Sequence, residues 1–373
     1  MPTTHPTIKI PGKLLSSLST LSPQERAELQ SLFQQSVSVQ AEDRRILVTG
    51  GAGFIGSALV WELNRLGCTN ILVSDKLSSD EKWKNLVPLK FADYIDGDDL
   101  LARLEQSPEA LGKFHQVLHL GACSATTERD AAYLMRNNFE YTKQLCHWSL
   151  RQGARFVYAS SAATYGDGTA GMDDKDDDID RLRPLNMYGY SKHIFDQHAR
   201  RAGLLGHIAG LKYFNVFGPN EDHKGDMRSV VHKACGQILS GGRVHLFKSH
   251  RPDFNDGEQM RDFLYVKDAV RMTLHLAGKP EANGLFNLGS GTAHTWLQLV
   301  RAIFAALERP PQIDFIDMPE HLREKYQYYT CADIAKLRAS GYTLEITPLA
   351  DAVRDYVVNY LVPGRHLGDE GAQ

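Results

Sequence analysis

The sequence has few cysteines, no long apolar run and no excess of charge of one sign. Its five cysteines among 373 residues form no Cys-x-x-Cys pair, so we expect reduced thiols and neither a disulfide framework nor a metal site. No stretch of about 18 apolar residues is present, which argues against a membrane-spanning helix. With 42 Lys and Arg against 45 Asp and Glu, the net charge of −3 disfavours binding to nucleic acid or an anionic membrane. We therefore expect a cytoplasmic protein without a secretory signal.

Apolar strands and helical stretches alternate along most of the chain. Residues 1–44 stand apart as an N-terminal extension, a Pro-containing flexible lead followed by a short helix from about Ser22. Helical patterns such as 54–66 and 131–151 then separate short apolar segments. These segments are 46–50, 70–75, 114–122, 154–161, 210–216 and 284–290. The alternation predicts an α/β fold of the Rossmann type, a doubly wound parallel sheet covered on both faces.

The motif TGGAGFIG follows the first predicted strand and opens the first predicted helix. It places Gly50, Gly53 and Gly56 at the spacing G-x-x-G-x-x-G. Glycines there allow a tight turn, a close approach of the backbone to a pyrophosphate, and close packing of the helix on the strand. The helix N-terminus then offers free N–H groups to the phosphates. The motif therefore predicts a dinucleotide cofactor.

The residues after the second strand leave the choice between NAD and NADP open. Asp75 ends that strand, and a carboxylate there can bond the ribose hydroxyls of NAD. Lys76 follows directly, and Lys82 and Lys84 come soon after. Their ammonium groups can hold the 2′-phosphate of NADP. From these residues alone, NADP is slightly favoured.

A Tyr-x-x-x-Lys pair and a strand-end serine indicate acid–base chemistry. Tyr188 and Lys192 are one turn apart if their segment is helical. We expect the ammonium of Lys192 to lower the pKa of Tyr188, which would make the phenol a usable base. Ser161 ends a predicted strand, where its hydroxyl can bond the same substrate oxygen.

Several motifs resemble the extended short-chain dehydrogenase/reductase family of nucleotide-sugar enzymes and, within it, the ADP-heptose 6-epimerase subfamily. The resemblance covers about residues 45–360. It is carried by TGGAGFIG, GACSATTE (121–128), YASSAATYG (158–166), PLNMYGYSK (184–192), KYFNVFGPNEDHKG (212–225) and RDFLYV (261–266). GACSATTE and the HKG ending are specific to the subfamily, whereas the glycine loop is not.

The resemblance implies an NADP-dependent isomerase that oxidises C6 of ADP-D-glycero-D-manno-heptose to a ketone and returns the hydride to the opposite face. The product is the L-glycero epimer, an intermediate suited to lipopolysaccharide core biosynthesis. The subfamily uses two acid/base groups, here Tyr188 and Lys224, because one base cannot reach the C6 hydroxyl proton of both epimers. Lys192 and Ser161 complete the catalytic set, and the family forms homo-oligomers.

The resemblance also carries over binding residues one by one. Phe54 and Ile55 would lie against the pyrophosphate, and Asp75, Lys76 and Lys82 around the adenosine ribose. The remaining cofactor residues would be Gly121, Ala122, Cys123, Ser124 and Asn137, together with Tyr188 and Lys192. The substrate would contact Ser124, Asn215, Val216, Lys224, Arg261 and Tyr326.

The chain departs from the family pattern at several places. Lys76 stands where an asparagine is common, and Gly97 replaces a family lysine that binds the cofactor. The segment 250–260 is longer than expected and can alter sugar or nucleotide preference. The acidic run 173–180 is typical of a solvated loop.

We expect two interwoven lobes. The cofactor domain would span 45–216 and be rejoined by about 262–285. The smaller, largely C-terminal α/β lobe for the substrate would span 217–261 and 286–365, followed by a tail at 366–373.

Two alternatives remain. One is another nucleotide-sugar epimerase or reductase of the same fold, and within it a 4-epimerase would not need Lys224. A dehydratase would need an Asp-Glu pair where Ala162 and Ala163 stand. A non-catalytic NADP-binding regulator would tend to lose the Tyr-Lys pair, which is present here.

Overall fold

The computed structural model describes residues 44–323 and 326–369, so the helix expected near Ser22 lies outside the described residues. Seven parallel strands form one sheet in the order β10-β6-β5-β4-β1-β2-β3. They are β1 (Ile46–Thr49), β2 (Ile71–Asp75), β3 (Asp93–Asp96), β4 (Gln116–His119), β5 (Arg155–Ser161), β6 (Ala209–Tyr213) and β10 (Gly284–Leu288). The predicted Rossmann-type parallel sheet is confirmed.

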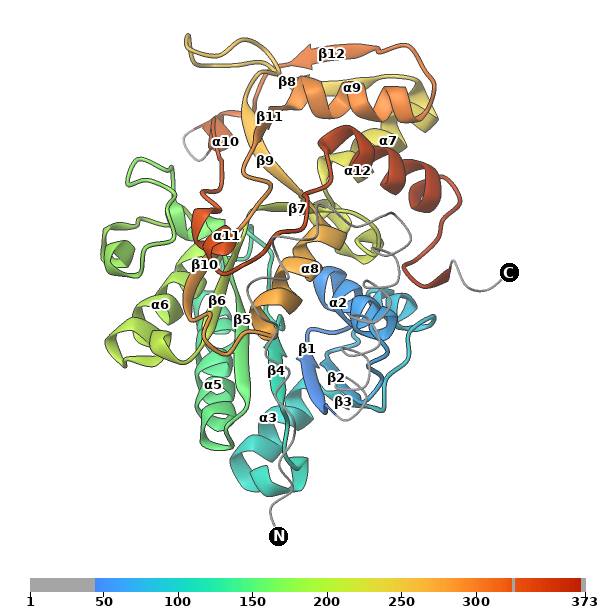
Figure 1. The fold of residues 1–373 in the computed structure, drawn as a ribbon. Coiled ribbons are helices and arrows are strands. Elements are labelled where there is room, and N and C mark those ends of the chain that lie inside the picture. Colours follow the sequence, from blue (N-terminus) through green and yellow to red (C-terminus); the bar gives the residue numbers. More distant parts are fainter. Residues whose placement is uncertain (1–43, 324–325, 370–373) are drawn as a thin grey trace, which may run out of the picture.

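Helices cover both faces of this sheet (Figure 1). They are α2 (Phe54–Arg65), α3 (Gly97–Gln106), α5 (Tyr141–Arg151), α6 (Met187–Arg201) and α8 (Val266–Ala277). Successive strand residues point to opposite faces. Val48 packs in the core under α2 and α8, whereas its neighbour Leu47 packs in the core under α3, α5 and α6. Burial on both faces explains why the strands appear as continuous apolar runs.

A second group of elements lies beyond the carboxyl edge of the sheet (Figure 1). β7 pairs with β9 in parallel, β11 pairs with β9 in antiparallel, and β8 pairs with β12. The strands are β7 (Asn215–Phe217), β8 (Val244–Phe247), β9 (Met260–Tyr265), β11 (Ala293–Thr295) and β12 (Ile313–Ile316). The helices are α7 (Val230–Gly241), α9 (Trp296–Ala306), α10 (Glu320–Arg323) and α12 (Leu349–Tyr356), while α11 (Ala335–Ala339) packs beside β10 of the main sheet.

Short helices connect these elements. Six are 3₁₀-helical: η2 (Lys82–Leu86), η3 (Pro108–Leu111), η5 (Ala162–Tyr165), η6 (Asp176–Arg181), η7 (Leu204–Gly206) and η8 (Asp222–Met227). The predicted helix 131–151 is instead α4 (Ala131–Leu134), the π-helical turn η4 (Met135–Glu140) and α5, and η9 (Val357–Leu361) is also π-helical.

The prediction of a single strand over residues 210–216 is wrong. β6 ends at Tyr213 in the main sheet and β7 begins at Asn215 in the smaller one. Only Phe214 separates them, so the chain passes between the two sheets there without a turn signal. The lobe boundaries drawn from the sequence stay a prediction.

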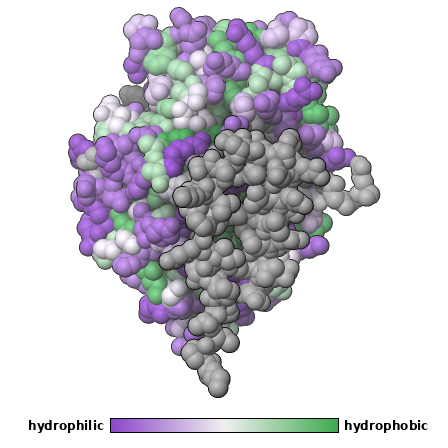
Figure 2. Space-filling model, in the orientation of Figure 1, coloured by the Kyte–Doolittle hydropathy of each residue, from purple (hydrophilic) through white to green (hydrophobic). Residues whose placement is uncertain are grey.

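The visible surface is largely hydrophilic, with hydrophobic residues scattered among polar ones (Figure 2). Among the described residues, no helix is both long and apolar enough to cross a membrane.

The acidic run 173–180 is not a solvated loop, contrary to the expectation. The buried carboxylate of Asp174 accepts a hydrogen bond of 2.8 Å from the backbone N–H of Asn287, and Asp176 accepts one of 2.9 Å from that of Leu285. Both donors belong to β10, the edge strand of the main sheet. The two carboxylates therefore cover a strand edge whose N–H groups would otherwise lack partners.

Replacing Asp174 by alanine leaves the buried N–H of Asn287 without an acceptor. We expect Asp174→Ala to lower the free energy of unfolding by about 1–3 kcal/mol, measured by urea denaturation. Asp177→Ala removes an exposed carboxylate of the same run and should change stability by less than about 0.5 kcal/mol. Equal losses in the two variants would contradict this role of Asp174.

Candidate active site

A cavity of about 500 Å³ lies at the carboxyl ends of β1, β4, β5 and β6. This is the edge at which parallel α/β sheets bind ligands. Most residues predicted for the site line it. These are Gly50, Gly53, Phe54, Ile55, Gly56, Asp75, Lys82, Gly121, Ala122, Cys123, Ser124, Ser161, Tyr188, Lys192, Val216 and Lys224. Five predicted residues are not among its lining: Lys76, Asn137, Asn215, Arg261 and Tyr326.

The glycine loop forms one wall of the cavity. Gly50 has φ +67°, and a Cβ there would lie 2.6 Å from the backbone N of Gly121. A Cβ on Gly56 would collide with the carbonyl oxygen of Gly50, so the start of α2 needs glycine to approach β1. At Gly53 a Cβ would meet only the carbonyl of Gly50, at 3.2 Å. No side chain caps α2, so its first N–H groups are available to a pyrophosphate.

Asp75, at the end of β2, holds this loop in place by hydrogen bonds. Its Oδ2 accepts hydrogen bonds from the backbone N of Ala52 at 2.9 Å and of Gly53 at 3.2 Å. Its Oδ1 lies 3.1 Å from Nζ of Lys82 and accepts a bond from the N of Lys76. The Lys76 ammonium pairs with Asp98 instead of entering the cavity. The carboxylate of Asp75, which the sequence predicts to bond a ribose, is thus already bonded to the glycine loop.

The end of β5 and the start of α6 bring the candidate catalytic residues together. Asn186 caps α6 by accepting a hydrogen bond from the N of Gly189 at 2.8 Å. One turn separates Tyr188 from Lys192, whose Nζ donates to the carbonyl of Ala159 at 2.8 Å. The Ser161 hydroxyl bonds the Tyr188 phenol.

The expected lowering of the Tyr188 pKa by Lys192 is not found. Burial raises the pKa of Tyr188, and the hydrogen bond from Ser161 only partly opposes this effect. Burial also lowers the pKa of Lys192 to about 8, against the opposing charge of Asp196. Desolvation exceeds the attraction between the two groups because the Lys192 ammonium is turned toward a backbone carbonyl.

Lys224 reaches the cavity from η8. Its Nζ lies 4.8 Å from the ring centroid of Phe54 and 3.8 Å from Oε2 of Glu221. Burial lowers the pKa of Lys224, while Glu221 raises it. A lowered pKa makes the neutral amine of Lys224 more accessible, which favours a role in proton transfer.

Asn138, next to the predicted cofactor residue Asn137, holds the segment that carries Cys123. The side chain of Asn138 bonds both the N and the O of Cys123 at 2.9 Å and the Ser191 hydroxyl at 2.9 Å. Asn138 lies in the π-helical turn η4, where an extra residue in the turn shifts which side chain points inward. No sequence pattern marks that shift.

A buried ion pair behind the catalytic residues was also missed. Asp196, one turn after Lys192, accepts hydrogen bonds of 2.8 Å from Tyr158 and Ser160 of β5 and lies 3.2 Å from Lys212 of β6. The pair therefore ties α6 to the strand that carries Ser161. The one signal in the sequence was Lys212 inside the otherwise apolar pattern of β6, since Asp196 lies in a helix with many polar residues.

Arg261 and Tyr326 lie together, apart from the cavity. The Arg261 guanidinium is 5.2 Å from the Tyr326 ring and 5.7 Å from the Trp296 ring, and the Tyr326 hydroxyl accepts a bond from Trp296 at 2.9 Å. Asn215 accepts a bond from Thr330 at 3.4 Å.

Ser161→Ala removes the hydrogen bond that lowers the pKa of Tyr188. We expect that pKa to rise further, so the limb of the pH–rate profile that reports Tyr188 moves to higher pH. Turnover at neutral pH should fall about tenfold or more. Ser240→Ala, which changes an exposed serine of α7, is the control. An unmoved limb would show that Ser161 does not act on Tyr188.

The sequence matches the NAD dependent epimerase/dehydratase family over residues 46–289. A protein of Nitratidesulfovibrio vulgaris (strain Hildenborough) named ADP-L-glycero-D-manno-heptose-6-epimerase is 54% identical over 315 residues, which are 84% of this chain and 97% of that protein. The crystal structure of Helicobacter pylori ADP-L-glycero-D-manno-heptose-6-epimerase is 26% identical, with a TM-score of 0.70 over 86% of this chain and 96% of that one. The UDP-glucose 4-epimerase of Thermus thermophilus in complex with NAD is 25% identical, with a TM-score of 0.66 over 86% and 99%.

Proposed function

We propose that this chain, which belongs to the NAD dependent epimerase/dehydratase family, inverts C6 of ADP-D-glycero-D-manno-heptose. It is a nucleotide-sugar epimerase, and its cofactor is a nicotinamide dinucleotide. The observation that carries the proposal is one cavity lined by both Tyr188 and Lys224, which come from separate elements, α6 and η8. The names of relatives that align over nearly their whole length supply the substrate class.

The glycine loop fits the cofactor, because the N–H groups at the start of α2 and the open side of Gly53 face the cavity. A nicotinamide dinucleotide held there would supply the hydride acceptor and donor that inversion at C6 requires. Tyr188 and Lys224 divide the proton transfers. Tyr188 serves the C6 hydroxyl of one epimer and Lys224 that of the other, each taking the proton on oxidation and giving it back on reduction. Ser161 bonds the same oxygen, and Lys192 supplies positive charge one turn from Tyr188.

The assay is direct. Incubation of the purified protein with ADP-D-glycero-D-manno-heptose should yield both C6 epimers, resolved by NMR, and no interconversion would contradict the substrate. Tyr188→Phe and Lys224→Ala should each lower turnover by about 10²–10⁴-fold, because each removes one proton-transfer group. Tyr190→Phe is the matched control, since Tyr190 lies on the same helix and is exposed. Full activity in the double variant Tyr188→Phe with Lys224→Ala would contradict the mechanism.

The preferred form of the cofactor is NADP. The carboxylate of Asp75, which would repel a 2′-phosphate, is satisfied by two backbone N–H groups and by Lys82. Lys82 lines the cavity, so its ammonium is placed to bond the phosphate.

Lys82→Ala removes that ammonium and leaves the charge of Asp75 without its partner. We expect affinity for NADP to fall about ten- to a hundredfold, the worth of a charge-assisted hydrogen bond, with a much smaller loss for NAD. Titration of the nucleotide-free protein with each dinucleotide measures this. Lys84→Ala, two residues along η2 and paired with Glu81, is the control. Equal losses for NAD and NADP would contradict the preference.

A further inference from the structure

The loop that carries Lys224 is held in place from three directions. Asn220, fully buried with φ +75°, donates to the Ser57 hydroxyl of α2 at 3.0 Å and accepts a bond from the backbone N of Leu367 at 2.9 Å. His223 lies 3.3 Å from the amide of Asn85, which also bonds the glycine loop through the carbonyl of Ala52. The loop is therefore fixed to the cofactor wall, to η2 and to the C-terminal segment.

Glu221 is a fully buried carboxylate in this loop. Its Oε1 accepts hydrogen bonds from the Ser229 hydroxyl at 2.5 Å and from the Tyr356 hydroxyl at 3.0 Å. Its Oε2 accepts one from the backbone N of Ser229 at 2.6 Å and lies 3.8 Å from Nζ of Lys224. Both carboxylate oxygens are thus bonded, and α12 supplies one of the donors.

A charge buried to this degree is costly, and neutral residues of similar volume fill such places at least as well. A buried carboxylate at this position therefore calls for a partner of opposite charge, and Lys224 is that partner. Across the described residues, Glu221 is the sole carboxylate in an ion pair with Lys224. Lys233 of α7 is a second positive charge, and it lowers the pKa of Lys224, whereas Glu221 raises that pKa. His223 adjoins Lys224 in the chain.

We propose that Glu221 is a positioning residue for catalysis, which holds the Lys224 ammonium at the cavity and is itself held there by Tyr356 of α12. Through Tyr356 and Glu221, helix α12 then contributes to the geometry of the active site. The inference rests on the proposed acid–base role of Lys224.

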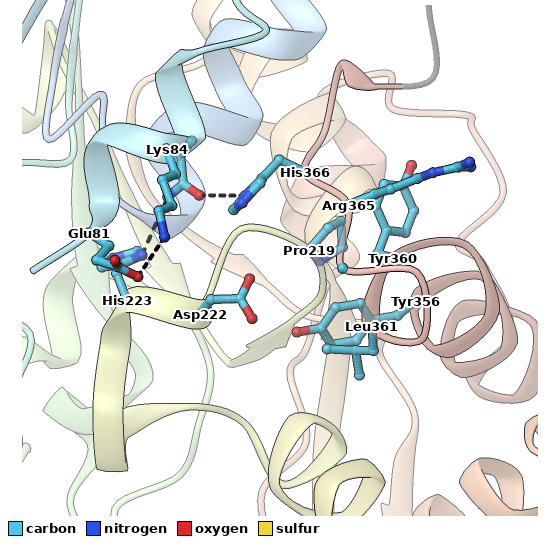
Figure 3. Close-up of a pocket in the computed structure, with 12 residues that line it drawn as sticks. Glu81, Lys84, Pro219, Asp222, His223, Tyr356, Tyr360, Leu361, Arg365 and His366 are labelled. Carbon is cyan, nitrogen blue, oxygen red and sulfur yellow. Dashed lines mark hydrogen bonds and ion pairs between the residues drawn. The ribbon is translucent and has the colours of Figure 1, made fainter. Parts of the chain in front are cut away.

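The Tyr356 hydroxyl is linked to the Lys224 loop by its hydrogen bond of 3.0 Å to Glu221. That tyrosine lines a separate cavity of about 220 Å³, with Tyr356 and Tyr360 on one side and Lys84 and His223 on the other (Figure 3). Tyr356 is not among the residues that line the larger cavity, so it contacts neither proposed substrate nor cofactor. A change at its hydroxyl that alters proton transfer must pass through the carboxylate.

The test replaces Glu221 by glutamine, which keeps the shape and removes the charge. We expect kcat to fall about tenfold or more, with KM for the nucleotide-sugar changed by less than about threefold. Loss of the negative charge lowers the pKa of Lys224, with Lys233 and His223 unchanged. The limb of the pH–rate profile that Lys224→Ala abolishes should therefore move to lower pH. Glu81→Gln is the matched control, because Glu81 borders the smaller cavity and pairs with Lys84 rather than Lys224.

Tyr356→Phe is the second variant. It keeps the buried ring and removes one hydrogen bond to Glu221. The same limb of the pH–rate profile should therefore also move to lower pH, but by a smaller amount than in Glu221→Gln. If Glu221→Gln does not fold, as judged by its thermal melt, this variant decides. An unmoved limb with wild-type kcat in the folded variants overturns the inference. Full activity in Lys224→Ala would instead contradict the proposed function, so the two failures are distinguishable.

Discussion

The close approach of the backbone at Gly50 to that at Gly121 is the constraint on which the cavity depends. β1 and β4 are neighbours in the sheet, and their following turns are in contact, with no room for a Cβ on Gly50. This contact directs the chain after β1 into α2 and the chain after β4 along the floor of the cavity. Asp75 then fixes the loop from β2. The candidate catalytic residues of β5 and α6 are placed against a wall that these contacts have already formed.

Three lysines at or behind the site are each paired with a carboxylate, in a chain with a net charge of only −3. Lys82 is paired with Asp75, Lys212 with Asp196, and Lys224 with Glu221. The carboxylate does different work in each pair. Asp75 holds the glycine loop, Asp196 ties a helix to a strand, and Glu221 joins the Lys224 loop to the C-terminal helix. Charge is therefore placed by local structure, and no basic surface is needed.

Local patterns predicted most of the main sheet and the motif residues that line the cavity. Apolar runs bounded by turn residues marked six of its seven strands, and β3, with acidic residues at both ends, escaped this pattern. Errors arose wherever distant contacts decide the outcome. Phe214 joins two sheets, the helix expected over 131–151 contains a π-helical turn, and Asp174 is buried against β10. Glu221 and Asp196 resemble ordinary surface carboxylates in the sequence, because their partners lie far along the chain or on another element.

Burial acts in opposite senses on the two proposed proton-transfer groups. It raises the pKa of the Tyr188 phenol and lowers the pKa of the Lys224 amine, because in each case it favours the neutral form. Burial therefore favours the protonated phenol of Tyr188 and the neutral amine of Lys224. For Tyr188 to accept a proton, positive charge must come close to its oxygen. The Lys192 ammonium, now 2.8 Å from the carbonyl of Ala159, is directed elsewhere. Tyr188 thus needs a nearby positive charge to act as a base. Burial and the charge of Lys233 lower the pKa of Lys224, whereas Glu221 opposes that shift and holds the ammonium at the cavity.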